Sequence, residues 1–380
     1  MTNQPTKKFS SRFIYFFGAF GGILFGYDIG VMTGALPFLQ KDWHLTDAGT
    51  IGWITSSLML GAIVGGALAG QLSDKLGRRR MILAASFIFA IGSVMAGISP
   101  NDGVAWLLIA RTLLGLAVGA ASALVPSYMS EMAPARTRGR LSGLNQLMIV
   151  SGMLLSYIVD YLLQGLPHDI AWRLMLGLAA VPAVILFLGV LRLPESPLFL
   201  VKTGHIDAAR RVLTYIRPGN EVAGELADIQ RTVAVEDGAQ KNITLATLFS
   251  SKYRYLVTAG IGVAAFQQFM GANTIFYYIP LIVEKATGQS AASALLWPIV
   301  QGCYLGLGCD LVYGDRRQVQ ASDTLDAWWD YHGVIFLNAS NLKHGCRGRE
   351  FATDADRCLP LNLCGFLLLH LGTIDLGLGW

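Results

Sequence analysis

The chain has 380 residues, of which 53% are hydrophobic and only 14% are charged. This composition is too apolar for an ordinary soluble domain and indicates a polytopic membrane protein. The net charge of +4 arises from short clusters of Lys and Arg beside apolar segments. These clusters lack the interleaved aromatic residues of a base-stacking surface, so nothing in the sequence suggests a nucleic-acid partner.

Apolar segments of bilayer length recur along the chain. A spanning helix needs about 20 mostly apolar residues, and the sequence predicts eight such helices. They are residues 13–36, 51–70, 81–98, 104–125, 141–163, 172–191, 257–283 and 291–311. The basic residues before the first segment are not followed by a small-residue cleavage pattern, so we expect an uncleaved first helix and not a signal peptide.

A single carboxylate lies near the middle of the first segment, at Asp28 in the sequence FGYDIGVM (residues 25–32). An ionised carboxylate at the centre of a spanning helix costs about 2.5–3.5 kcal/mol on insertion scales, so it needs an ionic partner, a water-filled cavity or a proton. Intramembrane ionisable groups are functional by default. Asp28 is therefore a candidate site residue, with a purely structural buried ion pair as the alternative.

The basic residues predict the orientation of the helices. Clusters of Lys and Arg follow the second span, at residues 75–80, and the fourth, at residues 136–140, while the alternate loops contain almost none. By the positive-inside rule both clusters and the N-terminus are cytoplasmic.

Glycines spaced four residues apart predict close packing between the spans, because small residues on one helix face let two backbones approach. The pairs are Gly61 with Gly65, Gly66 with Gly70, and Gly115 with Gly119. Glycine is also common in membrane helices, so the spacing of any single pair can reflect composition alone and not close packing.

A polar stretch separates the first six spans from the rest, between Pro194 and Arg254. Its apolar residues recur at helical spacing, with breaks at Pro218 and Gly219, which predicts short cytoplasmic helices. Six spans, a long cytoplasmic linker and further spans form the layout of a transporter built from two similar halves.

Four motifs carry a resemblance to a known family. The loop GQLSDKLGRRR (70–80) resembles the G-x-x-x-D-K/R-x-G-R-R/K-R/K loop of the major facilitator superfamily. Three further stretches are similar to motifs of its sugar porters: RTLLGLAVGAASALVPSYMSEMAPARTRGRL (111–141), PESPLFL (194–200) and QQFMGANTIFYY (267–278). Because the motifs occur in the family's order, the chain up to about residue 301 is identified as a member of this family.

The resemblance implies an all-α polytopic membrane protein with a major facilitator fold. It implies a complete six-helix N-terminal bundle at 1–193, cytoplasmic linker helices at 194–253 and the start of a C-terminal bundle at 254–301. Arg111 occupies the family's position for a partner of Asp28. Proton-coupled sugar porters carry an acid at the position of Asp28 and facilitative relatives tend to carry an amide, so the resemblance implies symport with Asp28 as the proton acceptor.

Sugar recognition requires neutral groups that both donate and accept hydrogen bonds, because a sugar presents hydroxyls and carries no charge. The family's pattern assigns sugar contacts to Phe25, as an apolar wall, and to Gln146, Gln267, Gln268, Asn273 and Tyr278. For Gln146 a hydrogen bond between helices is the alternative. No metal and no cofactor other than the coupling proton is implied, and no enzymatic reaction.

Charged residues at the cytoplasmic ends resemble the family's inner gate. They are Asp74, Arg78, Glu131, Arg138 and Glu195. We expect solvated rim pairs that are individually weak and that act by forming in one conformation and breaking in the other. Leu198 replaces the Arg usual after P-E-S-P, which puts one inner contact in doubt.

The sequence changes character after Gln301. All five cysteines lie between 303 and 364 without the spacing of a disulfide framework or metal site, and charges interrupt the expected spans. A one-nucleotide shift of the reading frame near 301–303 explains this change, because back-translation of the tail in the shifted frame permits a family-like sequence. We therefore expect residues 302–380 to be a non-family tail, the C-terminal bundle to be incomplete and the polypeptide as written to be inactive.

Taken together, the sequence predicts a sugar:proton symporter that imports a pentose or hexose of the xylose, arabinose or galactose type. We expect a multi-pass monomer in the cell membrane with a cytoplasmic N-terminus. A facilitative sugar uniporter, a transporter-like sugar sensor and a non-functional gene product are the alternatives.

Overall fold

The computed structural model describes residues 11–134, 138–239 and 254–269, with short pieces at 277–282, 284, 295 and 298–299. Secondary structure in these residues is helical, and the described part contains no strand. The chain divides into two compact units, Met1–Thr247 and Leu248–Trp380.

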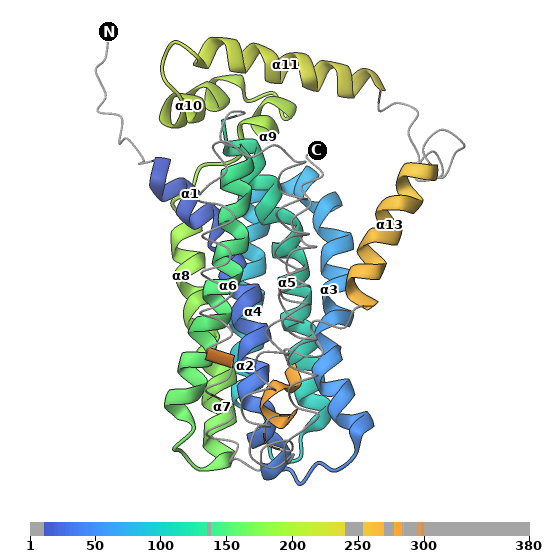
Figure 1. Ribbon diagram of the computed structural model, residues 1–380. Coiled ribbons are helices and arrows are strands. Elements are labelled where there is room, and N and C mark those ends of the chain that lie inside the picture. Colours follow the sequence, from blue (N-terminus) through green and yellow to red (C-terminus); the bar gives the residue numbers. More distant parts are fainter. Residues whose placement is uncertain are drawn as a thin grey trace, which may run out of the picture. The chain divides into compact units, whose positions relative to one another are not determined.

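Six helices in the described part are long and apolar enough to cross a membrane. The first span, Phe13–Asp42, combines α1 (Ser11–Ala19) and α2 (Gly21–Asp42), and the sixth, His168–Val190, combines α7 (His168–Leu178) and α8 (Ala180–Val190). The other four are α3 (Ala48–Leu76), α4 (Arg78–Gly97), α5 (Val104–Met132) and α6 (Arg138–Leu163). All six lie side by side in one bundle (Figure 1). The first six predicted spans are thus present, and most extend beyond the apolar residues that predicted them.

Local chemistry sets the ends of α3. The Asp47 side chain accepts hydrogen bonds from the backbone N–H groups of Gly49 (3.2 Å) and Thr50 (2.7 Å) and so caps the first turn. A hydrogen bond from the Thr50 hydroxyl, together with these two backbone bonds, holds the pKa of the Asp47 carboxyl below its usual range. The helix ends at Gly77, whose φ of 96° suits a residue without a side chain, and α4 begins at the next residue.

Two pairs of glycines bring the backbones of α3 and α5 into contact. A Cβ on Gly61 or Gly65 of α3 would overlap backbone oxygens of α5, and a Cβ on Gly115 or Gly119 of α5 would overlap those of α3. These two predicted pairs therefore pack reciprocally. For Gly70 of the third predicted pair the close contact is not found, since a Cβ there would meet nothing within 4 Å among the described residues.

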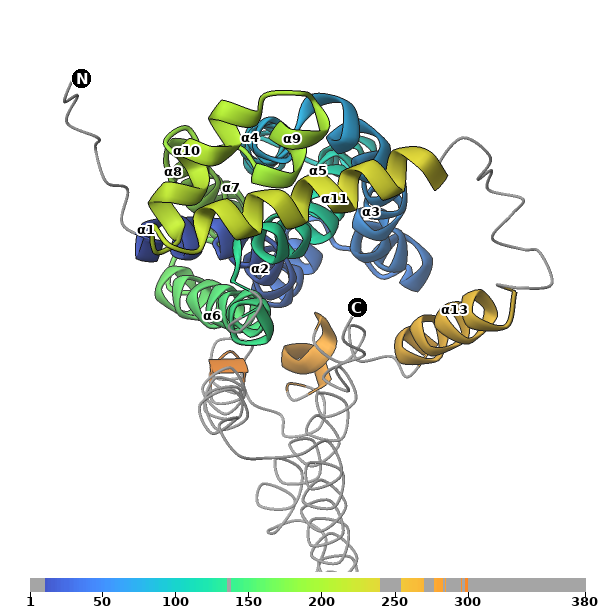
Figure 2. The same cartoon turned by 90° about the horizontal axis from the view of Figure 1, so that it is seen from above.

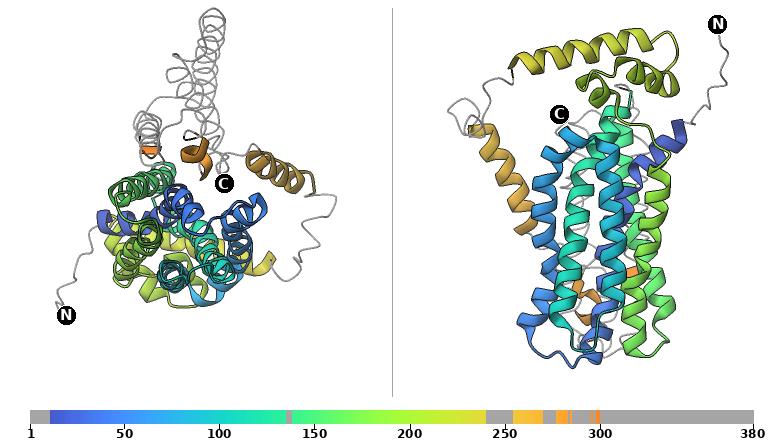
Figure 3. Two further views of the ribbon diagram at one scale, coloured as in Figure 1. Left: turned by 90° about the horizontal axis from the view of Figure 1, so that it is seen from below. Right: turned by 180° about the vertical axis from the view of Figure 1, so that it is seen from behind.

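A longer glycine stripe on α2 was not predicted. Gly22, Gly26, Gly30 and Gly34 follow one another at four-residue spacing, and each lies against α6, where an added Cβ would collide. Seen from below, α2 lies beside α6, and α3 beside α5 (Figure 3). Because Gly22 meets Asn145 and Gly34 meets Asp160, α2 and α6 run parallel.

Three linker helices lie across one end of the bundle, as the view from above shows (Figure 2). They are α9 (Pro197–Lys202), α10 (Ile206–Ile216) and α11 (Val222–Ala239), so the predicted break at Pro218 and Gly219 falls between α10 and α11. Buried Arg217 binds Glu225 through Nε (2.5 Å) and Nη2 (2.7 Å) and donates to the backbone oxygen of Met132 at the end of α5 (3.0 Å). The linker is thereby attached to the bundle.

The second unit contributes α13 (Arg254–Phe269) to the described residues. This helix falls in the predicted seventh span, while the predicted eighth span lies almost wholly outside the described residues. The boundaries assigned to the domains from the sequence stay a prediction.

Candidate functional site

Two opposite charges meet inside the bundle. Asp28 of α2 and Arg111 of α5 have side-chain exposures of 1% and 0%, and Asp28 Oδ2 lies 3.7 Å from Arg111 Nη2. Neither side chain has a hydrogen-bond partner among the described residues. The predicted pairing of these groups is therefore present in the structure as a close but loose ion pair.

The chemistry of this pair follows from its burial. Removing one partner of a buried ion pair leaves an uncompensated charge and costs about 3–5 kcal/mol. A proton on Asp28 has the same electrostatic effect as removing its charge. Any change in the charge of Asp28 would therefore act directly on Arg111, and the absence of hydrogen bonds within the described residues leaves few other contacts to hold either group.

Phe25 and Gln146 are the predicted sugar contacts within the first unit. Phe25 is partly exposed although every other residue from Gly21 to Leu39 is buried. Gln146 of α6 is also partly exposed, and the helix-to-helix hydrogen bond considered for it is not found in the described part of the chain. The matched levels of Gly22 with Asn145 and Gly26 with Ile149 place Phe25 and Gln146 within about one turn of each other along the parallel helices.

The remaining predicted sugar contacts belong to the second unit. Gln267 and Gln268 lie on α13, but their side chains are outside the described residues. Asn273 lies outside them entirely, and Tyr278 is described as partly exposed.

Charged side chains gather at the end of the bundle that faces the linker helices. Arg78 lies 3.0 Å from Asp74 Oδ1 and 3.1 Å from Glu131 Oε1. The Ser196 hydroxyl donates to the other oxygen of Glu131. The expectation of solvated rim pairs is wrong for Arg78 and Glu131, whose exposures are only 12% and 11%, because the chain around Ser196 covers them. It holds for Asp74, which is 51% exposed.

Glu195 completes this inner cluster by binding the turn between α3 and α4. Its Oε1 accepts from the backbone N–H of Arg79 (3.0 Å), while the Arg79 side chain donates to the backbone oxygens of Val190 (3.1 Å) and Leu191 (2.6 Å). Gly77 leaves room for the Glu195 carboxylate, which an added Cβ would overlap. Arg138 belongs to the predicted gate, but its side chain lies outside the described residues.

A polar cluster at the opposite end was not predicted. Asp42 Oδ2 accepts from Trp172 Nε1 (2.9 Å) and lies 3.3 Å from Arg173 Nη1. The Arg173 guanidinium also donates to the Ser99 backbone oxygen (3.1 Å) and to Asn101 Oδ1 (2.6 Å). These bonds tie α2, the end of α4 and α7 together. The only sequence signal was an acid that ends an apolar segment.

Asp160 is a second buried carboxylate that sequence reasoning missed. It lies on α6 with 0% exposure, and neither of its oxygens has a hydrogen-bond partner in the part of the chain that the structure describes. Its sequence signal was an acid near the end of an apolar segment. This signal is weak, because an acid at the end of a span is usually exposed to solvent.

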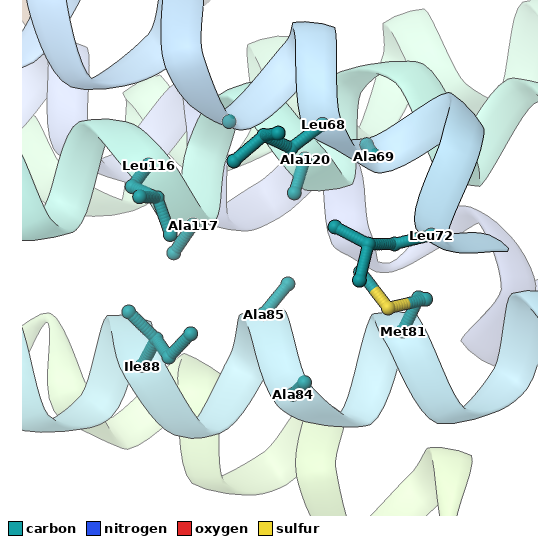
Figure 4. A pocket seen from close by; sticks show the side chains of 11 residues that line it. Leu68, Ala69, Leu72, Met81, Ala84, Ala85, Ile88, Leu116, Ala117 and Ala120 are labelled. Carbon is teal, nitrogen blue, oxygen red and sulfur yellow. The ribbon is translucent and has the colours of Figure 1, made fainter. Parts of the chain in front are cut away.

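A cavity of about 160 Å³ lies between α3, α4 and α5 (Figure 4). Its lining is entirely apolar, and includes Leu72, Met81, Ile88 and Leu116. Such a lining offers no donor or acceptor to a sugar hydroxyl, so this cavity is not the sugar site. Within the described residues there is no cluster of three or more His, Cys, Asp or Glu suited to a metal ion.

Comparison with known proteins places these features in a family. The family model of the sugar (and other) transporters matches residues 14–306. The D-xylose transporter of Levilactobacillus brevis is 44% identical over 322 residues, which cover 84% of this chain and 67% of that protein. The galactose-proton symporter of Escherichia coli is 38% identical, with coverage of 78% and 61%. The chain thus spans about two thirds or less of the length of these relatives.

The fold is also that of a solved transporter. A partially occluded inward-open structure of the xylose transporter XylE from Escherichia coli matches with a TM-score of 0.75 and 25% identity, over 96% of this chain and 85% of that one. The chain therefore belongs to the family of sugar (and other) transporters and has the major facilitator fold. It is a multi-pass membrane protein of a transporter family and not an enzyme.

Proposed function

We propose that this protein is a sugar:proton symporter that imports a pentose or hexose of the xylose, arabinose or galactose type by alternating access. The observation that carries the proposal is the wholly buried Asp28–Arg111 pair. The relatives support both substrate classes, since one is named a D-xylose transporter and another a galactose-proton symporter.

Proton binding changes the forces between α2 and α5. With Asp28 ionised, its attraction to Arg111 holds the two spans in one arrangement. With Asp28 protonated, Arg111 keeps its charge and must find other acceptors or water, because a buried unpaired cation is unfavourable. The rearrangement that follows is the step that couples the proton to the opening of the cavity.

Neutral side chains are the proposed sugar contacts in each unit. We assign Phe25 as an apolar wall and Gln146 as a hydrogen-bonding group, supported by their partial exposure at matching levels of α2 and α6. Gln267, Gln268, Asn273 and Tyr278 are the contacts proposed for the second unit.

The inner cluster acts as a gate. Its proposed members are Asp74, Arg78, Glu131, Arg138 and Glu195. The contacts of Arg78 with Asp74 and Glu131, and of Glu195 with the Arg79 backbone, support this role for all of them except Arg138.

The protein functions as a monomer in the cell membrane, with the N-terminus, the inner cluster and the linker helices in the cytoplasm. The distribution of Lys and Arg supports this orientation.

Residues 302–380 are a tail produced by a shifted reading frame, and the polypeptide as written does not transport, because alternating access needs two complete halves. The family model supports this proposal, since its match ends at residue 306. The nucleotide sequence of the gene provides the test. A single insertion or deletion near codon 301 that restores the family pattern supports the proposal, and the absence of any such change overturns it.

The coupling role is tested by Asp28→Asn in a version with the family's reading frame restored, purified and placed in liposomes. We expect sugar counterflow to persist and accumulation driven by a proton gradient to be lost, because Asn cannot bind the proton. Asp169→Asn, at an exposed position on α7, is the matched control and should keep both activities. Accumulation that survives in Asp28→Asn contradicts the coupling role, and a parent protein that equilibrates sugar without accumulating it is a uniporter.

A further inference from the structure

Asp160 is the buried acid that the proposed function does not use. Its side chain lies against Gly34, at the contact between α6 and the second half of α2, where an added Cβ would overlap the carboxyl group. The contact is nearer to Asp42 than to the N-terminus of α2. In the orientation proposed above, it therefore belongs to the outer half of the bundle.

No cation compensates this carboxylate in the described residues. Among the charged and titratable groups on the helices that pack against α6, Arg111 of α5 pairs with Asp28 of α2, and Arg173 of α7 pairs with Asp42 of α2. The other such groups on these helices are Tyr15, Tyr27, Lys41, Tyr128, Glu131, His168 and Asp169, together with Arg12 at the start of α1, whose side chain lies outside the described residues. Tyr27 lies two helical turns before Gly34 on α2, and a neutral phenol does not compensate a carboxylate.

An ionised carboxylate at this place would be buried without a hydrogen bond or a counter-ion within the described part. Such a group neutralises itself by binding a proton, since the desolvation of an isolated charge is far more unfavourable than protonation. The protonated carboxyl is also a donor. Gln164 follows one helical turn later and presents its Oε1, which is likewise buried without a partner among the described residues.

We propose that Asp160 is a second proton-binding site of the transporter, occupied while α2 and α6 are in contact at Gly34 and emptied when that contact opens to the outer solution. In the open state water reaches the carboxyl, the O–H bond breaks and the proton passes to water, which leaves a solvated carboxylate. Closure reverses these steps. External proton concentration thereby biases the opening of the outer half, independently of the Asp28–Arg111 pair. This inference depends on the proposed transport function for the side of the membrane from which the proton enters. The protonation of Asp160 itself does not depend on that function.

The protonation is tested without any transport assay. Infrared spectra of the purified protein, recorded as the pH is raised, should contain the carbonyl stretching band of a buried protonated carboxyl at pH values where an ordinary aspartate is ionised. We expect Asp160→Asn to lose this band and Asp169→Asn to keep it. Asp28→Asn is recorded beside them, so that a band from Asp28 is assigned separately. A spectrum unchanged by Asp160→Asn overturns the proposal.

A second variant covers the case in which Asp160→Asn does not fold. Gly34→Ala forces the Asp160 carboxyl out of its contact, so we expect the band to persist but to titrate at lower pH as water gains access. A titration unchanged by this variant counts against the proposed site.

Exchange with the outer solution is tested by sugar counterflow in the frame-restored protein at several external pH values. We expect the dependence of the initial rate on external pH to be lost in Asp160→Asn and kept in Asp169→Asn. A parent-like profile in Asp160→Asn would mean that the proton is permanently bound, which overturns the gating role. Loss of all counterflow in the parent protein would instead contradict the proposed transport function.

Discussion

Arg78 and Arg111 show how burial decides what a single charge does. Both contact a carboxylate on another residue, but Arg111 is fully enclosed with one ionic partner among the described residues, whereas Arg78 has a partly buried partner in Glu131 and an exposed one in Asp74. Water screens the attraction between Arg78 and the exposed Asp74, but it screens the enclosed ion pairs much less. The two carboxylates of Arg78 should therefore differ in their contribution to stability.

We predict that Glu131→Ala lowers the free energy of unfolding by about 1–3 kcal/mol, because it removes the partly buried carboxylate that Arg78 and the Ser196 hydroxyl both contact. Asp74→Ala on the same arginine should change it by only about 0–1 kcal/mol. Denaturant unfolding in detergent micelles measures both. Equal losses in the two variants would show that the enclosure of Glu131 has no energetic consequence.

At the scale of whole elements, glycine stripes set the distance between helices. On α2 Gly30 and Gly34 meet the side chains of Ser156 and Asp160, whereas Gly22 and Gly26 meet backbone atoms of α6, which cannot move aside as a flexible side chain can. A substitution there must separate the two helices along their length. Glycines that face open space should tolerate the same change.

We predict that Gly26→Ala destabilises the protein by about 1–3 kcal/mol or more, because its Cβ would overlap the backbone of Ile149. Gly52→Ala on α3 is the control, since its Cβ would meet nothing within 4 Å and Ala favours a helix by about 0.5–1 kcal/mol over Gly. Thermal unfolding of the purified variants gives the comparison. A Gly26→Ala protein as stable as the parent would contradict the close approach of α2 and α6.

At the scale of the first unit, the linker helices lie at one end of the bundle (Figure 1). The basic residues 75–80 join α3 to α4 at that end, and the Asp42–Arg173 cluster lies at the other, where α2 ends and α7 begins. The bundle can cross a membrane only with these two ends on opposite sides. The concentration of Lys and Arg near the linker then favours the cytoplasm for that end.

We predict that a cysteine at position 165 reacts with a membrane-impermeant maleimide in intact cells, and that one at position 207 reacts only after permeabilisation. Both Gly165 and Asp207 are exposed, at opposite ends of the bundle. The labelling uses a version in which the five native cysteines are replaced. The reverse pattern would show that the N-terminus is outside.

The sequence by itself determined the six spans of the first unit and the helical linker, and the family resemblance of its motifs predicted the pairing of Asp28 with Arg111. An apolar segment of bilayer length can form little other than a spanning helix, and a charge within it needs a partner. The local sequence pattern was therefore sufficient to predict these features. The tertiary structure decided which charges are enclosed, as at Glu131 and Asp160, and which glycines carry contacts, as along α2 and not at Gly70. Those properties depend on which helix faces meet, and such contacts join residues that are far apart in the chain.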